Sequence, residues 1–311
     1  MAKADLQAPA FTDDNAAREA MEAVLWPHGP RCPRCQSLDR IGKIAGASAR
    51  PGLYYCGECK RQFTVTVGTI FERSKVSLSK WWLAVHLMAS SKKGMSAHQL
   101  HRMLGVTYQT AWFMEHRIRA AMASGDLTPM GGEGVTVEID ETFIGKKAGV
   151  PKRRGYAHKH AVMTLIERRP QGGRARSFHV AGTAAADLLP IIKAHVSSGS
   201  HVMTDEAGQY AHLNKHFAAH DFVTHGAGEY VRGNVHTNTL EGFYSVFKRG
   251  MKGIYQHCSE VHLHRYVAEF DFRYNARSRL GVDDAERAAT VIRGAAGKRL
   301  MYRWPDEAAS V

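Results

Sequence analysis

Long apolar runs are missing from this chain of 311 residues, in which no window holds eighteen consecutive apolar side chains. A helix that crosses a bilayer needs about 20 such residues, so we expect no membrane span and no membrane partner. The first ten residues also lack the apolar core of a secretory signal peptide. We therefore expect a cytoplasmic protein.

Cysteine is scarce, with five residues in the whole chain. Disulfides are rare in the reducing cytoplasm, so clustered cysteines there indicate a metal site. The motifs Cys32-Pro-Arg-Cys35 and Cys56-Gly-Glu-Cys59 are separated by twenty residues. Two such knuckles supply four thiolates in a tetrahedron, which suits Zn²⁺ and leaves no open position for catalysis. The sequence therefore predicts a structural zinc ribbon, with Cys258 left as an ordinary small apolar residue.

Acidic residues are outnumbered, 29 against 42 Lys and Arg, which gives a net charge of +13. Such an excess favours a nucleic-acid partner, although a basic surface can also serve solubility alone. The charge is clustered, because ten Lys or Arg residues and one acid, Glu167, lie between Lys146 and Arg176. We expect the loop after Gly145 to lie along DNA through its basic residues, namely Lys146, Lys147, Lys152, Arg153 and Arg154.

Composition shifts divide the chain. The stretch Ser124–Gly134 is rich in glycine and marks a linker. The predicted parts are a loose tail (1–15), a zinc ribbon with a leading helix (16–74), a helical DNA-binding region (75–125), a catalytic domain (133–290) and a C-terminal tail (291–311).

The helical region contains a pattern typical of a helix-turn-helix. Ser96 is placed to cap one helix, Gly105 to make a sharp turn and Thr107 to cap a second helix. In that motif the early residues of the second helix face the major groove of DNA. The expected DNA-contacting residues are Tyr108, Gln109 and Thr110. An ordinary three-helix packing unit is the alternative.

From residue 135 onward the pattern changes to strands joined by helices. We expect strands at 135–140, 161–167, 177–181, 201–204 and 221–224, and helices at 184–196, from 239 and at 260–276. Three successive strands followed by helical crossovers imply an α/β fold, with a mixed sheet flanked by helices. The order of elements is that of an RNase H-like fold.

Three carboxylates stand in positions that favour catalysis. Asp140 and Asp205 each end an apolar run, and Glu241 follows in a helical segment after thirty-five intervening residues. Each aspartate alone is equally consistent with a turn or a helix start. A carboxylate on a buried sheet is costly unless a metal or hydrogen bonds satisfy it. Together the three acids can hold two Mg²⁺ ions for phosphoryl transfer. Lys248, two helical turns after Glu241, would contact the phosphate.

These motifs resemble those of bacterial insertion-sequence transposases of the DDE class, in the group with an N-terminal zinc ribbon. The resemblance rests on the ribbon, on Ile139–Gly145, on the strand end at Asp205 and on His236–Arg249. It implies an RNase H-like catalytic domain, Mg²⁺ dependence and recognition of terminal inverted repeats. Some members of the group use Asn as the third site residue, so Asn238 competes with Glu241. We prefer Glu241, because it is ionic and is followed seven residues later by Lys248.

The predicted function is that of a DNA transposase, which binds terminal repeats and catalyses metal-dependent strand cleavage and strand transfer. Its partners would be double-stranded DNA, both terminal repeat and target, and further copies of the chain in a synaptic complex. On DNA it would be associated with the nucleoid. Two alternatives share part of the pattern: an RNase H-like nuclease that cuts without joining, and a transcription regulator that uses only the zinc ribbon and helix-turn-helix.

Overall fold

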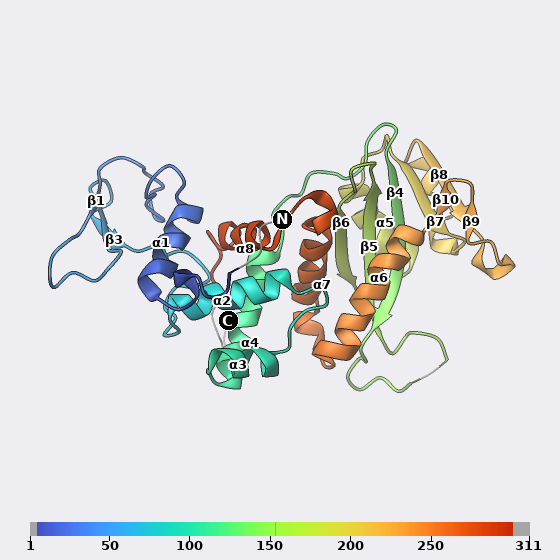
Figure 1. Ribbon diagram of the computed structural model, residues 1–311. Helices are drawn as coiled ribbons and strands as arrows, with labels where there is room; N and C mark the ends of the chain where they lie inside the picture. The colour runs from blue at the N-terminus through green and yellow to red at the C-terminus, as the bar shows by residue number, and fades with distance from the viewer. Residues whose placement is uncertain (1–4, 153, 301–311) are drawn as a thin grey trace, which may run out of the picture. The chain divides into compact units, whose positions relative to one another are not determined.

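The computed structural model describes residues 5–152 and 154–300. The chain forms two compact units (Figure 1). The head unit comprises 1–124 and 282–311, and the sheet unit comprises 125–281. Within the described residues, no helix combines the length and apolarity needed to cross a bilayer.

The head unit begins with a helix and a small antiparallel sheet. Asp13 caps the helix by accepting a hydrogen bond from Ala16 N at 2.8 Å, in the manner typical of helix N-termini. Trp26 packs against Tyr54 and Phe63 of this sheet, and the three side chains form a small aromatic core. The elements are α1 (Asp14–Leu25), β1 (Ile41–Lys43), β2 (Tyr54–Cys56) and β3 (Arg61–Phe63).

The rest of the head unit is helical, and its last helix comes from the far end of the chain. The helices are α2 (Leu78–Ser90), α3 (Ala97–Leu104), α4 (Tyr108–Met122) and α8 (Asp284–Arg293). Helix α8 packs against α1, α2 and α4. Its apolar stripe, Ala288, Val291 and Ile292, is buried there, which is where an amphipathic helix gains its stability.

The boundaries of the units differ from those of the sequence-predicted domains. The predicted zinc ribbon and helical region fall in one unit, and the sheet unit begins at Gly125. Val291 and Ile292, expected in a C-terminal tail, are buried. The chain leaves the sheet unit after Gly281, so α8 belongs to the head unit and not to a catalytic domain that ends at residue 290. The sequence pattern missed this because an amphipathic helix does not show which core it joins. Of the predicted tails, residues 1–4 and 301–311 lie outside the described residues.

The sheet unit is built on a five-stranded mixed sheet with the order β6-β5-β4-β7-β8. The first three strands pair antiparallel, and β7 and β8 are added parallel to β4. The strands are β4 (Thr136–Ile144), β5 (His160–Arg168), β6 (Ala175–Val180), β7 (His201–Asp205) and β8 (Ala219–Val223). The predicted mixed α/β architecture is confirmed. Strand β4 runs four residues beyond the predicted end at Asp140, because its pairing with β5 continues to Ile144 opposite His160.

Helices cover both faces of the sheet (Figure 1). On one face α5 (Ala185–His195) packs on the odd-numbered apolar residues of β4, Val137 and Ile139. On the other face α6 (Asn238–Gly250) and α7 (Glu260–Asn275) cover Val162 and Ile166 of β5. Since side chains alternate along a strand, Glu138 and Asp140 belong to the α6 face of β4.

Short elements complete the two units. They are a hairpin of β9 (Val231–Arg232) and β10 (Val235–His236), a π-helical turn at Met251–Tyr255, and 3-10 turns at Pro9–Phe11, Gly208–Tyr210, Leu213–Lys215, His225–Ala227 and Ser278–Leu280.

Candidate active site and metal centre

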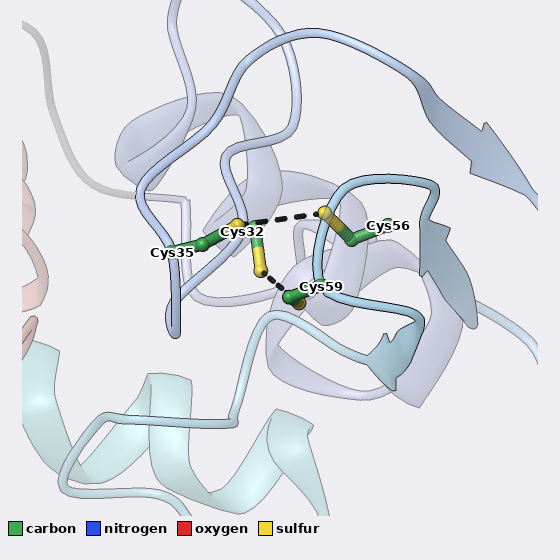
Figure 2. Close-up of side chains that lie close together, drawn as sticks. All are labelled: Cys32, Cys35, Cys56 and Cys59. Atoms are coloured by element: carbon green, nitrogen blue, oxygen red, sulfur yellow. Dashed lines mark hydrogen bonds between the residues drawn. The ribbon is translucent and has the colours of Figure 1, made fainter.

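The four predicted cysteine ligands come together in the head unit (Figure 2). Their sulfur atoms all lie within 4.8 Å of one another, and the Cys32–Cys59 and Cys35–Cys56 pairs are each 3.6 Å apart. Tetrahedral bonds of about 2.3 Å to zinc place sulfurs about 3.8 Å apart. The cluster therefore fits a structural Zn²⁺.

Both knuckles have the same backbone geometry. The residue after each pair, Gln36 and Lys60, has a positive φ of 61° and 56°, a conformation that non-glycine residues seldom adopt. Burial acts to raise the pKa of the Cys32 thiol, but backbone hydrogen bonds from Cys35 and Arg34 outweigh it and lower the pKa to about 7. At Cys32 the turned backbone N–H groups thus favour the thiolate, which is the form that binds metal. At Cys59 burial and the neighbouring thiols raise the pKa instead, to about 12.

In the sheet unit, Asp140 and Asp205 lie on neighbouring central strands. The parallel register pairs Thr136 with His201 and Glu138 with Met203. Continued along both strands, this register puts Asp140 level with Asp205. The two acids are far apart in sequence, and the sheet brings them together.

Asp140 and its neighbour Glu141 are crowded, poorly solvated carboxyls. Burial raises the pKa of Asp140 to about 8, with further increases from the charges of Asp205 and Glu141. Burial also raises the pKa of Glu141 to about 7, against hydrogen bonds from Tyr210 and Gln209 that favour its ionised form. Like charges in a desolvated place disfavour ionisation unless a cation is present. This donor set of hard oxygens suits Mg²⁺.

Helix α6 faces this pair. The Tyr244 hydroxyl donates to the Asp140 carbonyl oxygen at 2.6 Å. The Lys248 ammonium lies 5.8 Å from the centre of the Tyr244 ring, and the negative charge of Asp140 acts on it. The predicted lysine is therefore near Asp140. Residues three and four apart share a helix face, so Glu241 is on the same face as Tyr244 and Lys248.

Glu241, the third predicted acid, is not grouped with Asp140 and Asp205. Glu241 is exposed in the first turn of α6, and its charge acts on His236. Among the described residues, no group of metal-ligating atoms within 4.8 Å contains Glu241 with Asp140 and Asp205. Asn238, the alternative third residue, is exposed at the first position of α6. The structure thus brings Asp140, Asp205 and Lys248 into one region of the sheet unit. On α6, Glu241 lies about one helical turn before Tyr244, and Asn238 lies about two turns before it.

A buried network beside the site was not predicted. Glu138, fully buried, accepts a hydrogen bond from Leu240 N at 2.9 Å and pairs with Arg168. Arg168 also donates to the carbonyl oxygens of Asn234 and His236. One carboxylate thereby fixes the start of α6 and the end of the β9–β10 hairpin. The signal in the sequence was a charged residue at an inward position of a strand, two residues before Asp140.

In the head unit, α3 and α4 have the predicted caps and turn. Ser96 accepts from Gln99 N and Thr107 from Thr110 N, each at 3.2 Å, and Gly105 is left-handed with φ of 60°. At the start of α4, Tyr108 and Gln109 are exposed and Thr110 is partly exposed. These three residues border a cleft of about 540 Å³, which Trp112 and Phe113 also line. Trp81 is buried in the core of the head unit.

The predicted basic loop connects β4 to β5. Lys146, Lys152 and Arg154 are exposed, and Lys147 is partly buried, with its N–H donating to His158 O at 2.8 Å. Arg153 lies outside the described residues.

Comparison with known proteins matches two parts of the chain. Residues 12–62 match the transposase zinc-ribbon domain, and residues 130–275 match the ISXO2-like transposase domain. A relative from Halobacterium salinarum, described as an uncharacterized protein in transposable element ISH50, is 29% identical over 293 residues, which cover 85% of this chain and 91% of the relative. The zinc ribbon and the sheet unit thus each carry a transposase signature. Residues 12–62 therefore belong to the transposase zinc-ribbon domain family and residues 130–275 to the ISXO2-like transposase domain family, which confirms the resemblance to zinc-ribbon insertion-sequence transposases.

Proposed function

We propose that the protein is a DNA transposase that binds the terminal repeats of its element and catalyses DNA cleavage and strand transfer in the sheet unit. The observation that carries the proposal is the proximity of Asp140 and Asp205 on adjacent parallel strands, where the charge of one acts on the other, with Lys248 near Asp140. The strand order and the helices on both faces support an RNase H-like fold. The match to a transposase domain over residues 130–275 supports DNA transposition as the class of reaction.

The residues fit a divalent-metal site. Asp140 and Asp205 offer hard oxygens on adjacent strands, and the raised pKa of Asp140 disfavours its ionisation without a cation. Glu241 shares the face of α6 that carries Tyr244 and Lys248. Two bound Mg²⁺ ions would stabilise the attacking and the leaving oxygen of the displaced phosphate. Lys248 is placed to neutralise a phosphate oxygen, since its ammonium lies beside Asp140 and is only partly buried.

Recognition of the terminal repeats is assigned to the head unit. The start of α4 presents exposed polar and aromatic side chains, as a helix that enters the major groove does. The basic loop between β4 and β5 adds phosphate contacts that do not depend on base sequence. The active complex would contain more than one copy of the chain, because two element ends must be cut and joined together.

The decisive experiment replaces Asp140 by Asn in the full-length chain. We expect Mg²⁺-dependent nicking and joining of an oligonucleotide from the element's own end to fall at least about 1000-fold, because a metal ligand is lost. Binding of the same oligonucleotide should stay within about twofold. Asp187→Asn removes an exposed carboxylate on the α5 side of the sheet and is the matched control. Cleavage at the wild-type rate in Asp140→Asn would refute the proposal. If the wild-type chain cut the oligonucleotide but made no joined product, the protein would be a nuclease instead.

A second pair of variants decides the third ligand. Glu241→Gln should abolish Mg²⁺-dependent cleavage, whereas Asn238→Ala should retain most of it, because Glu241 is ionic and lies two helical turns before Lys248, while Asn238 is neutral and lies one turn further away. Single-turnover cleavage over a Mg²⁺ titration measures both. The opposite ranking would assign the third position to Asn238.

A further inference from the structure

Two histidines and a glutamate converge in the sheet unit at a place that the proposed DNA chemistry does not use. His160 is the first residue of β5, His179 lies near the end of β6, and Glu260 begins α7. Each residue offers one ligand atom, and the three atoms lie within 4.8 Å of one another. Nothing in the function proposed above requires this cluster.

The fold brings the three residues together for a clear reason. His179 is paired with Val162 of β5, and His160 is on the same face as Val162, so the two histidines are diagonal neighbours across the strand pair. Val162 belongs to the core beneath α6 and α7. Hydrogen bonds from Ser177 to Asp271 tie α7 along β6. The first residue of α7 therefore arrives over the histidine pair.

The spacing suits a coordinated cation better than direct hydrogen bonds. His160 Nδ1 lies 3.7 Å and His179 Nε2 lies 3.6 Å from the two carboxylate oxygens of Glu260. Hydrogen bonds between nitrogen and oxygen are about 2.7–3.2 Å long. Ligand atoms around a tetrahedral zinc with bonds of 2.0–2.2 Å are about 3.3–3.6 Å apart. The observed separations are close to the second range.

Two ring nitrogens in the cluster also lack hydrogen-bond partners. His160 Nδ1 and His179 Nε2 are buried and make no hydrogen bond among the described residues. Buried polar atoms are nearly always satisfied, so an orphaned pair directed at one carboxylate calls for a physical reason. Burial, with the charges of His160 and Lys147, lowers the pKa of His179 against the opposing effect of Glu260. A neutral imidazole keeps its lone pair for a metal.

We propose that His160, His179 and Glu260 form a second transition-metal site, which takes Zn²⁺ with water as a further ligand. Two imidazoles and a carboxylate are a ligand set that zinc accepts, with an open position. The bound ion ties the start of α7 to β5 and β6. It also fixes the end of the basic β4–β5 loop, because His160 directly follows that loop.

The test counts zinc in the full-length protein by elemental mass spectrometry. The protein is dialysed against Zn²⁺ in excess Mg²⁺, which occupies oxygen-rich sites. We expect two zinc ions per chain in the wild type, one in the ribbon and one in the new site. Glu260→Gln and His179→Ala should each hold one. Glu260 is 57% exposed, so its replacement leaves the core intact.

Controls separate this proposal from the others. His212→Ala removes an exposed histidine of the same unit and should keep two zinc ions. Asp140→Asn should also keep two, whatever its effect on DNA cleavage. Added Zn²⁺ should raise the melting temperature of the wild type more than that of Glu260→Gln. A wild type with one zinc, or a Glu260→Gln variant with two, would show that the cluster is only a histidine–carboxylate ion pair.

Discussion

At the scale of single residues, Asp271 on α7 shows how burial makes stability depend on pH. Its two carboxylate oxygens accept from the N–H and the hydroxyl of Ser177 at 2.8 and 2.6 Å. Desolvation nevertheless raises its pKa to about 6, with those hydrogen bonds acting in the other direction. The folded chain therefore holds the Asp271 proton more tightly than the unfolded chain does. The resulting stabilisation is complete below pH 3.8 and is lost as the pH rises through about 6.

Asp271→Asn should remove this dependence. The amide does not titrate and can still accept from Ser177 N and donate to Ser177 Oγ. We expect the variant to gain stability relative to wild type by on the order of 1–2 kcal/mol between pH 4 and pH 7. Urea unfolding at the two pH values measures the difference. An equal difference at both would mean that Asp271 titrates normally in the folded state.

Individual residues were the part of the site that sequence predicted best. The cysteine quartet, the caps at Ser96 and Thr107 and the turn at Gly105 follow from local chemistry, and each has the expected geometry. The roles of Glu138 and Arg168 could not be predicted, because their partners are the start of α6 and a hairpin distant in sequence. Only the folded sheet shows which inward charge is paired.

At the scale of elements, the head unit and the basic loop should contribute differently to DNA binding. Gln109→Ala, at the start of α4, should lose about 1–3 kcal/mol on the terminal repeat and little on random DNA. Lys152→Ala, in the loop, should weaken binding to both and reduce the slope of log K against log salt by about one. Binding titrations over a salt series separate the two. If both variants lost the preference for the terminal repeat over random DNA to the same extent, α4 and the basic loop would not have separate roles in DNA binding.

The spacing of apolar residues predicted most of the helices and strands of the sheet unit. It did not predict the residues at which they end. The predicted strand at 177–181 occupies 175–180, and the predicted helix at 184–196 occupies 185–195. The largest error was at the end of β4, which continues through Thr142 and Phe143 to Ile144. The successive acids Asp140 and Glu141 interrupt the apolar alternation, so the sequence pattern predicted an end there, although pairing with β5 carries the strand on to Ile144.

At the scale of the whole molecule, the boundaries of the sheet unit can be tested with fragments. A fragment of residues 125–281 keeps Met130, which is buried and pairs with Val196, and Gly131, whose N–H donates to Glu167. A fragment of residues 133–290 loses those contacts and exposes the apolar stripe of α8. We expect the first to melt cooperatively and the second to be less stable or to aggregate. Circular dichroism melts and gel filtration compare them, and equal behaviour would contradict the division into units.

Because α8 belongs to the head unit, the core of the head unit can be completed only late in translation. On the ribosome α1 to α4 emerge early, but the helix that completes their core is translated only after the entire sheet unit. A message broken within the sheet unit would yield a head with a bare apolar groove where α8 belongs. Such a nascent fragment would be a substrate for proteases. If the head unit binds the element's ends as proposed, only a chain whose sheet unit has been translated would bind them with a completed core.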